Sequence, residues 1–277
     1  MLHITNGDSA NGYLKRIGIL GQFQAWQDAL HEGKITAHTD LTIISERRSH
    51  FLAEYFCLDL KTVQAKFAKR DDVFGGWPIN EPMTLWLTPE LFDALIGLQF
   101  LAWYRDSGRA IEQLNIVMLP EYLPPQDLTA AEIINHYQSR FSPSAEFFQL
   151  AEQVWLGLVT SLDMLERTLA LDFKYWPNLK PAMLRYLEEK RLNHGYNRTQ
   201  WQIIEALANG PLSLAQLFGA NQNQEEVAFM GDLSFWCLLE QMRDIININT
   251  DECILHHEIE FYHLHQCQLN AQGLALL

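Results

Sequence analysis

The 277-residue sequence predicts an α/β domain built on a small parallel, doubly wound sheet, followed by an α-helical region that ends in a winged-helix-like module. Three observations predict this arrangement. Short apolar runs alternate with amphipathic segments over the first 120 residues, three prolines interrupt the alternation within residues 120–125, and most of the remaining chain has helical spacing of its apolar residues. Strands that alternate with helices are typical of a parallel sheet with right-handed crossovers.

The α/β domain is predicted over residues 1–122. Its strands are expected at four short apolar runs: 2–5, 22–26, 83–87 and 114–119. Its helices are expected between those runs, at residues 9–18, 42–57, 61–70 and 88–106. The first of these helices ends at Gly18, since glycine favours helix termination. The last one opens with Thr88 as its N-cap and Pro89 in the first helical position.

The domain boundary is placed in the proline-rich stretch 120–129, and residues 129–277 form the predicted helical region. Helices are expected there at 129–139, 143–159, 162–171 and 179–192. From about residue 197 the pattern changes to three helices followed by two strand-like segments, 245–249 and 259–269. Three helices and a two-stranded wing are typical of a winged helix, which in many proteins reads DNA with its third helix.

The charge of the chain is unevenly distributed. The formal net charge is −14, and residues 199–277 hold ten acidic residues against one basic residue, Arg243. The predicted third helix carries Asp232, Glu240 and Asp244 beside that arginine. Affinity for nucleic acid comes mostly from Lys and Arg side chains that neutralise phosphates, so we expect no nucleic-acid binding. A basic protein partner is the kind of molecule on which this acidic module would dock.

The N-terminus lacks the pattern of a secretory signal, in which a basic start precedes an apolar core. None of the apolar runs approaches the ~20 residues that span a bilayer. Four cysteines are too few for a disulfide framework in a chain of this length. We therefore expect a soluble cytoplasmic protein with no membrane partner.

The stretch HITNGDSANG, residues 3–12, runs from a strand into a helix and is the first candidate site. The carboxyl ends of parallel strands feed helix N-termini, whose free N–H groups attract anions. Gly7 would let the backbone approach a ligand, and Asp8 or Ser9 would face it or cap the helix. We predict a pocket for phosphate or another anion, with helix capping alone as the alternative. The glycine spacing fits neither a P-loop nor a dinucleotide-binding fingerprint.

A second polar cluster, Asp28, His31, Glu32 and Gly33, follows the second predicted strand. Consecutive strands are usually neighbours, and this cluster would then lie beside the first candidate site. Ser9, Asp28 and His31 would in that case be a nucleophile, an orienting acid and a base. Alternatively, Asp8, His31 and Glu32 act as general acid and base or bind polar ligand groups, or the loop is only a polar surface.

A serine after the first strand, together with an Asp-x-x-His pair, resembles the hydrolase family named for a Gly-Asp-Ser-Leu motif. The resemblance implies a serine nucleophile. The sequence departs from the family pattern in two ways. In the family the Asp-x-x-His pair lies near the C-terminus, and leucine follows the serine where this chain has Ala10.

Two further features are candidate sites. Arg48, in a pair of arginines at the start of a predicted helix, would pair with an anionic ligand or simply be solvated. The C-terminal stretch contains Cys253, His256, His257, His263, His265 and Cys267. On one strand, residues 263, 265 and 267 would share a face and offer three zinc ligands. Their spacing matches no familiar zinc finger, so we favour histidines on a wing strand and assign neither a metal nor a cofactor.

The motifs HITNGDSANGYLK, AWQDALHEGKI and LWLTPELFDALIGLQFLA resemble an uncharacterised bacterial family catalogued as domain of unknown function 1835. NRTQWQIIEALANGPLSLAQLF and EEVAFMGD resemble the C-terminal half that often accompanies it. The resemblance spans roughly residues 1–120 and 180–245. The family has no established activity, so the resemblance implies a shared site rather than a reaction. That site would comprise Gly7, Asp8, Ser9, Asp28, Glu32 and Gly33.

The sequence departs from this second family pattern after the third strand. The family has Glu-His-Asp there, and this chain has Thr88, Pro89 and Glu90. Trp86 and Asp93 fit the pattern. If the missing histidine is catalytic in the family, this chain lacks the corresponding activity.

Two functions follow from these observations. The first is a ligand-binding protein or enzyme whose anion-binding pocket lies at the C-terminal edge of the N-terminal sheet. The alternative is a non-catalytic interaction or regulatory protein, in which an acidic winged-helix module binds a protein partner and not DNA.

Overall fold

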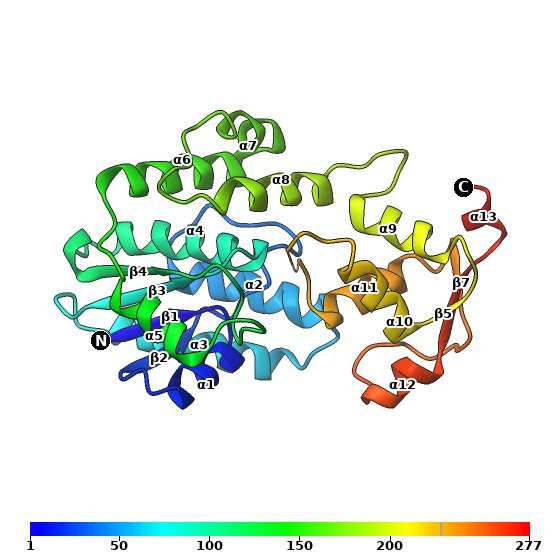
Figure 1. The fold of residues 1–277 in the computed structure, drawn as a ribbon, viewed down its shortest axis with the longest axis horizontal. Helices are drawn as coiled ribbons and strands as arrows, with labels where there is room; N and C mark the ends of the chain where they lie inside the picture. Colours follow the sequence, from blue (N-terminus) through cyan, green and yellow to red (C-terminus); the bar gives the residue numbers. More distant parts are fainter. Residues whose placement is uncertain (228) are drawn as a thin grey trace. The chain divides into compact units, whose positions relative to one another are not determined.

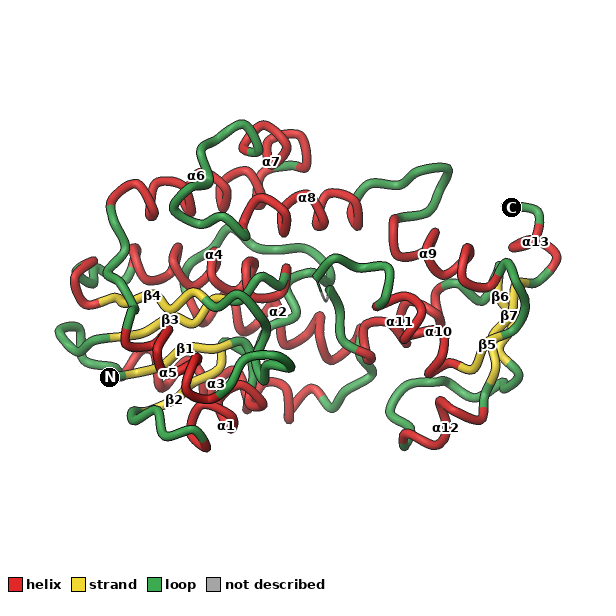
Figure 2. Tube along the Cα trace, in the orientation of Figure 1, coloured by secondary structure: helices red, strands yellow, loops and turns green. Residues whose placement is uncertain are grey.

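The computed structural model describes residues 1–227 and 229–277 (Figures 1 and 2). These residues form two compact units. Unit 1 holds residues 1–54 and 58–186, and unit 2 holds residues 55–57 and 187–277. Each unit has its own sheet.

Unit 1 is built on a four-stranded parallel sheet, as the sequence predicts. Its strands are β1 (Leu2–Thr5), β2 (Gln22–Ala25), β3 (Met83–Leu87) and β4 (Leu114–Met118). The order is β2-β1-β3-β4, and every neighbouring pair is parallel. The chain leaves β1 toward β2 and later returns on the other side of β1, at β3. The carboxyl ends of β1 and β3 therefore flank the point where the winding direction reverses, which is where open α/β sheets bind ligands.

The helices of unit 1 largely follow the predicted segments. They are α1 (Asp8–Arg16), α2 (Leu41–Tyr55), α3 (Leu60–Gly76), α4 (Leu91–Asp106), the 3₁₀-helix η1 (Ile111–Gln113), α5 (Ala130–Gln138), α6 (Ala145–Thr160), α7 (Leu162–Thr168) and α8 (Leu179–Lys190), the last of which runs into unit 2.

The start of α4 differs from the prediction. The helix begins at Leu91, and its N-cap is Glu90 rather than Thr88. Thr88 donates both its hydroxyl and its backbone N–H to the carboxylate of Asp93. This pair of hydrogen bonds holds Thr88 outside the helix, so it cannot act as the cap.

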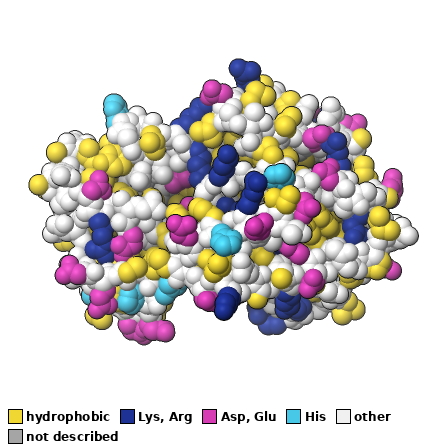
Figure 3. Space-filling model, turned by 180° about the vertical axis from the view of Figure 1, so that it is seen from behind, with side chains coloured by type: hydrophobic (Ala, Val, Ile, Leu, Met, Phe, Trp, Pro, Cys, Tyr) yellow, Lys and Arg dark blue, Asp and Glu magenta, His cyan; other side chains and the backbone are white. Residues whose placement is uncertain are grey.

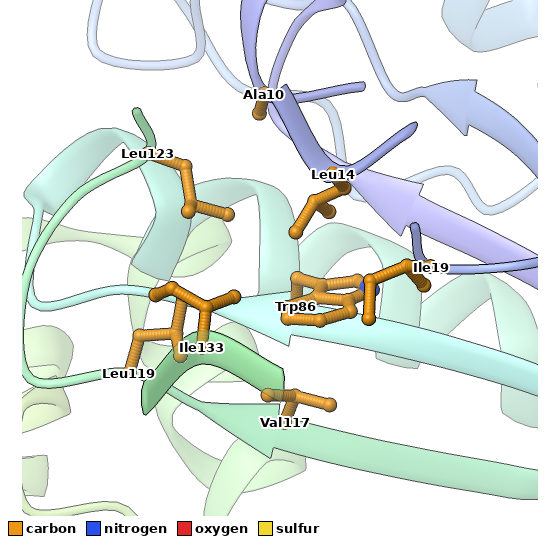
Figure 4. Close-up of a cluster of buried hydrophobic side chains, with 8 residues drawn as sticks. All are labelled: Ala10, Leu14, Ile19, Trp86, Val117, Leu119, Leu123 and Ile133. Atoms are coloured by element: carbon orange, nitrogen blue, oxygen red, sulfur yellow. The ribbon is translucent and has the colours of Figure 1, made fainter. Parts of the chain in front are cut away.

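The two faces of the sheet are covered by different helices. Trp86 of β3 faces α1 and α5, where it packs with Leu14 and Ile133 (Figure 4). The next residue, Leu87, points the opposite way, because successive side chains of a strand alternate between faces. A Cβ added at Gly97 would lie 2.7 Å from Leu87, which places α4 on that opposite face.

The division between the units falls inside α8, not in the predicted boundary at 120–129. Helices expected in the second domain pack instead with the sheet. Ile133 of α5 belongs to the buried cluster around Trp86, and Phe141 forms an antiparallel bridge with Ile116 of β4. Phe147 of α6 stacks on Trp176, with ring centroids 5.5 Å apart. The prolines therefore mark a turn within unit 1.

Unit 2 combines helices with a three-stranded antiparallel sheet of order β5-β7-β6. Its elements are α9 (Arg198–Leu207), β5 (Leu212–Ser213), α10 (Leu214–Gln222), α11 (Asp232–Gln241), β6 (Ile246–Ile248), α12 (Ile259–Leu264), β7 (Gln266–Leu269) and α13 (Ala271–Leu274).

The strand predicted over 259–269 is half wrong, because α12 occupies residues 259–264 and only β7 is extended. Tyr262 explains the helical turn. Its ring stacks on Trp236 at a centroid distance of 4.4 Å, and its hydroxyl donates to the carbonyl of Ile254. Burial of Tyr262 against α11 outweighs the period-2 pattern that predicted a strand.

Within the part of the chain that the structure describes, each helix is either too short or too polar to cross a membrane. Acidic and basic side chains are scattered over the face drawn in Figure 3.

The close contact of α4 leads to a first prediction. Gly97→Ala should lower the free energy of unfolding by about 1–3 kcal/mol, because the added methyl would lie 2.7 Å from Leu87 and 2.8 Å from Trp176. Gly12→Ala in α1 is the matched control. Its Cβ would meet nothing within 4 Å, so helix propensity should stabilise that variant by ~1 kcal/mol. Urea unfolding measures both, and equal stabilities would contradict the packing of α4.

Candidate functional site

Two helices begin at the carboxyl edge of the parallel sheet, beside the reversal point. The chain passes from β1 through Asn6 and Gly7 into α1, and from β3 through Thr88 and Glu90 into α4. Neither N-cap residue, Gly7 or Glu90, makes a side-chain capping hydrogen bond. The first N–H groups of both helices are therefore left for other partners.

Two carboxyl groups, those of Glu90 and Asp93, lie at this edge and are bridged by the hydroxyl of Thr88. Asp93 is 3% exposed, and its Oδ2 accepts from the Thr88 hydroxyl at 2.6 Å. Oδ1 of Asp93 is buried without a hydrogen-bond partner among the described residues. Oε2 of Glu90 lies 3.3 Å from the same hydroxyl. A hydroxyl has one proton to donate, so a protonated Glu90 would complete the chain by donating to Thr88.

The two carboxyl groups have different proton affinities. The pKa of Glu90 is raised to about 8. Burial is the main cause, and the neighbouring charge of Asp93 is the second. Burial also raises the pKa of Asp93 to about 6, against the hydrogen bonds from Thr88 and Asn6, which lower it. At neutral pH the pair therefore holds one proton, mainly on Glu90. A carboxylic acid beside a carboxylate is the arrangement that general acid–base catalysis needs.

The neighbouring strand ends add polar groups. Gln27, just beyond β2, donates to Oδ2 of Asp8 at 2.9 Å. Gln27 has a φ of 56°, a left-handed conformation that costs free energy for a residue with a side chain. Thr5 donates to the buried Asn11 at 2.7 Å and so fixes the start of α1. Asn6 is close enough to lower the pKa of Asp93, which links the ends of β1 and β3.

A buried ion pair shapes the segment after β2. Nε of Arg48 donates to both carboxylate oxygens of Asp28, at 2.8 and 3.1 Å. Its Nη1 and Nη2 donate to the carbonyls of Glu32 and Ala29 at 3.0 and 2.8 Å. Both Arg48 and Asp28 are 2% exposed. Burial raises the pKa of Asp28, and the guanidinium groups of Arg48 and Arg70 oppose that rise.

Arg70 supports the same segment from α3. It is fully buried, and its Nη1 donates to the carbonyl of Trp26 at 3.1 Å. Its Nη2 donates to the hydroxyl of Ser45 at 2.8 Å, and its Nε donates to Asp71. Arg48 and Arg70 thus donate the hydrogen bonds that water would otherwise donate to the carbonyls of the irregular chain after β2.

The three residues of the predicted triad lie in different environments. Ser9 is exposed on the first turn of α1, whereas Asp28 and His31 are buried. The carboxylate of Asp28 accepts hydrogen bonds from Arg48 through both of its oxygens. His31 lies against Phe92 of α4, with ring centroids 5.6 Å apart. The geometry therefore supports a structural role for Asp28 as the partner of Arg48, and it packs the ring of His31 against α4.

The remaining residues of the predicted ligand-binding set have several roles. Arg48 is committed to Asp28 and two carbonyls, so it is a clamp rather than an anion ligand. Glu32 lies 3.6 Å from the ring nitrogen of His31. Gly7 has an extended φ of −158°, which any residue can adopt, so no turn requires glycine there. A Cβ added at Gly7 would meet nothing within 4 Å, which leaves open space at the N-terminus of α1.

Gly33 is required by the fold. Its φ is +66°, in the left-handed region that favours glycine, and a Cβ there would overlap the ring of Phe51. The same ring stacks against the guanidinium group of Arg48 at 4.8 Å. Gly33 thus belongs to the clamp around Arg48.

The C-terminal histidines do not share one strand face. His263 belongs to α12, and His265 follows it as the C-cap. His257 donates to the carbonyl of Cys253, and His265 contacts Oδ1 of Asn249 at 3.3 Å. In the described part of the chain, no three Cys, His, Asp or Glu side chains are placed to hold a metal ion.

Neither the models of known protein families nor the curated proteins give a match to this sequence.

Sequence reasoning missed the main acid pair. In the sequence, Asp93 stands out only because it fits the family pattern, and Glu90 only because it departs from that pattern. The available signal was an aspartate inside a long apolar helix that directly follows a buried strand. An acidic side chain in such a position is rarely buried without a functional reason.

The clamp leads to a second prediction. Arg48→Lys should lower the free energy of unfolding by about 3 kcal/mol, because an ammonium group cannot bind Asp28 and two carbonyls in the geometry of a guanidinium. Arg47→Lys is the matched control, since Arg47 is exposed and its contact with Thr36 is long, at 3.4 Å. Its effect should stay within ~0.5 kcal/mol. Urea unfolding compares them, and a neutral Arg48→Lys would refute the clamp.

The raised pKa of Glu90 leads to a third prediction. Between pH 4.5 and about 8 the unfolded chain loses this proton while the folded protein keeps it, so stability falls as the pH rises. Glu90→Gln removes that penalty and should gain about 2 kcal/mol over the wild type between pH 5 and pH 8. Glu81→Gln, at an exposed position, is the control. A Glu90→Gln gain that is independent of pH would contradict the assignment.

Proposed function

We propose that unit 1 binds a small polar ligand at the carboxyl edge between β1 and β3, and that Glu90 and Asp93 exchange protons with it. The observation that carries this proposal is the carboxyl pair itself, with pKa values of about 8 and about 6 at the reversal point of the sheet. Burying two acids together without a cation costs stability, and such sites cluster at functional positions.

The pair assigns a role to each acid at neutral pH. Glu90 holds a proton and is the general acid. Asp93 is mainly ionised and is the general base, and its Oδ1 is the atom left for the ligand. Thr88 joins the two, because its hydroxyl donates to Asp93 and lies within hydrogen-bond distance of Glu90. This arrangement supports proton transfer to and from a hydroxyl or amino group of the ligand.

The chemistry of the edge favours hydroxyl or amino groups over the phosphate that the turn at Gly7 predicts. Asp8, Glu90 and Asp93 all lie at the helix starts of this edge. The negative charge of Asp93 would repel an anion, whereas its carboxylate and that of Asp8 accept hydrogen bonds from hydroxyls. Carboxylates at the carboxyl ends of strands bind sugar hydroxyls in this way in doubly wound folds.

For unit 2 we propose a winged-helix fold that binds a protein. The order of α9, α10 and α11 before β6, and the sheet order β5-β7-β6, support that fold. Most of α11 is buried, including Phe235 and Trp236, which leaves little of it to enter a DNA groove. Ten acidic residues against one basic residue in 199–277 favour a basic protein partner.

A ligand screen tests the proposal for unit 1. Purified protein is heated with nucleosides, free sugars, amino alcohols and inorganic phosphate, alongside Asp93→Asn and the exposed control Asp72→Asn. A hydroxylated compound at about 100 times its dissociation constant should stabilise the wild type and the control by roughly 2.7 kcal/mol. It should not stabilise Asp93→Asn to the same extent.

The opposite result is also informative. Stabilisation by phosphate that persists in Asp93→Asn would refute the acid-pair site and restore the predicted anion site at the start of α1. Stabilisation by a hydroxylated compound that is equal in all three proteins would place its site elsewhere.

A further inference from the structure

A cavity lies in unit 1 away from the carboxyl edge, between the second half of α4 and α6. Its volume is about 230 Å³, and residues 37–39 close its third side. The floor is apolar and includes Leu98 of α4 and Phe148 and Trp155 of α6. A dry cavity of about 150 Å³ admits benzene, so this one has room for a single ring with a short side arm.

The segment that closes the third side is held in place. The hydroxyl of Thr39 donates to Oδ2 of Asp106, at the end of α4, at 2.7 Å. Leu156 on α6 also lines the cavity and is 59% exposed, although its neighbour Trp155 is only 7% exposed. A large apolar side chain at the mouth of an apolar cavity is an uncovered contact for a ligand.

The rim of the cavity has an excess of negative charge. Arg105 forms an ion pair with Glu152 across α4 and α6, and Asp106 lies beside Arg105 in sequence. The charge of Asp106 also acts on the guanidinium group of Arg105, so one arginine lies near two carboxylates. An ammonium group entering here meets a net negative charge, whereas a carboxylate meets an arginine whose charge Glu152 already balances.

From this geometry we infer that the cavity binds a small amphipathic cation, such as an arylalkyl- or alkylammonium ion. Its apolar body would lie on Phe148, Trp155 and Leu156. Its ammonium group would lie at the rim, near Glu152 and Asp106. Aromatic and aliphatic walls with a few polar groups at one end are typical of small-molecule sites. The site is independent of the acid pair at the start of α4.

Calorimetric titration with three matched probes tests this inference. Phenethylamine, phenethyl alcohol and phenylpropionate share a ring and differ in the charge of the head group. The amine should bind most tightly, and its affinity should fall as salt is added, because the rim charges are exposed. Glu152→Gln should weaken binding of the amine by about 2–5-fold, the effect of one half-exposed ion pair.

The apolar wall has its own variant and control. Leu156→Ser should reduce the affinity for the amine by about tenfold, since it removes an exposed apolar contact without disturbing the core. Leu184→Ser, at a 43% exposed leucine outside the cavity, should leave it unchanged. Thermal unfolding of each variant confirms that the fold is kept.

Three results would overturn the inference. The first is that phenylpropionate binds more tightly than phenethylamine and that Arg105→Gln abolishes this binding, which would show that Arg105 binds an anion. The second is equal binding of amine and alcohol in wild type and Leu156→Ser, which would indicate non-specific association. The third is no heat from any probe at millimolar concentration.

Discussion

The buried ion pair between Arg48 and Asp28 is the interaction on which the carboxyl edge of unit 1 depends. The chain after β2 is irregular, yet it is buried, so its polar groups need partners inside the protein. Arg48 supplies them from α2, and Arg70 does so from α3. An apolar pair of the same volume would pack as well, but it would not fix two carbonyls and a carboxylate in one geometry. Gln27, the residue before Asp28, donates to Asp8 at the same edge.

The same edge holds acids in two contrasting environments. Asp28 is as buried as Asp93, but two guanidinium groups oppose its desolvation. Burial dominates the pKa of Asp93 and Glu90, and only hydrogen bonds oppose it. The first pair stabilises a loop, and the second keeps a proton at neutral pH at the expense of stability. This difference, rather than burial alone, separates a structural acid from a reactive one.

The sequence was sufficient to predict what depends on local periodicity. The runs 2–5, 83–87 and 114–119 alternate with amphipathic helices, and the four-stranded parallel sheet follows from them. The sequence could not reveal that Asp28 binds Arg48, because the two are joined only after α2 folds back on the sheet. It could not place Glu90 and Asp93 in one site either, since Thr88 carries the ordinary signal of a helix cap. The proline content of residues 120–129 is typical of a linker between domains. Ile133 nevertheless packs with the sheet of unit 1, so the prolines lie in a turn within that unit.

The position of α4 explains where unit 1 can hold polar chemistry. Twelve of its sixteen residues are buried, because the helix lies between the sheet on one side and α6 on the other. Gly97, at its middle, leaves no room even for a methyl group beside Leu87 and Trp176. Charged side chains can therefore reach solvent only near the two ends of the helix. Glu90 and Asp93 lie at the first end and Arg105 and Asp106 at the second, so a buried helix confines both candidate sites to its ends.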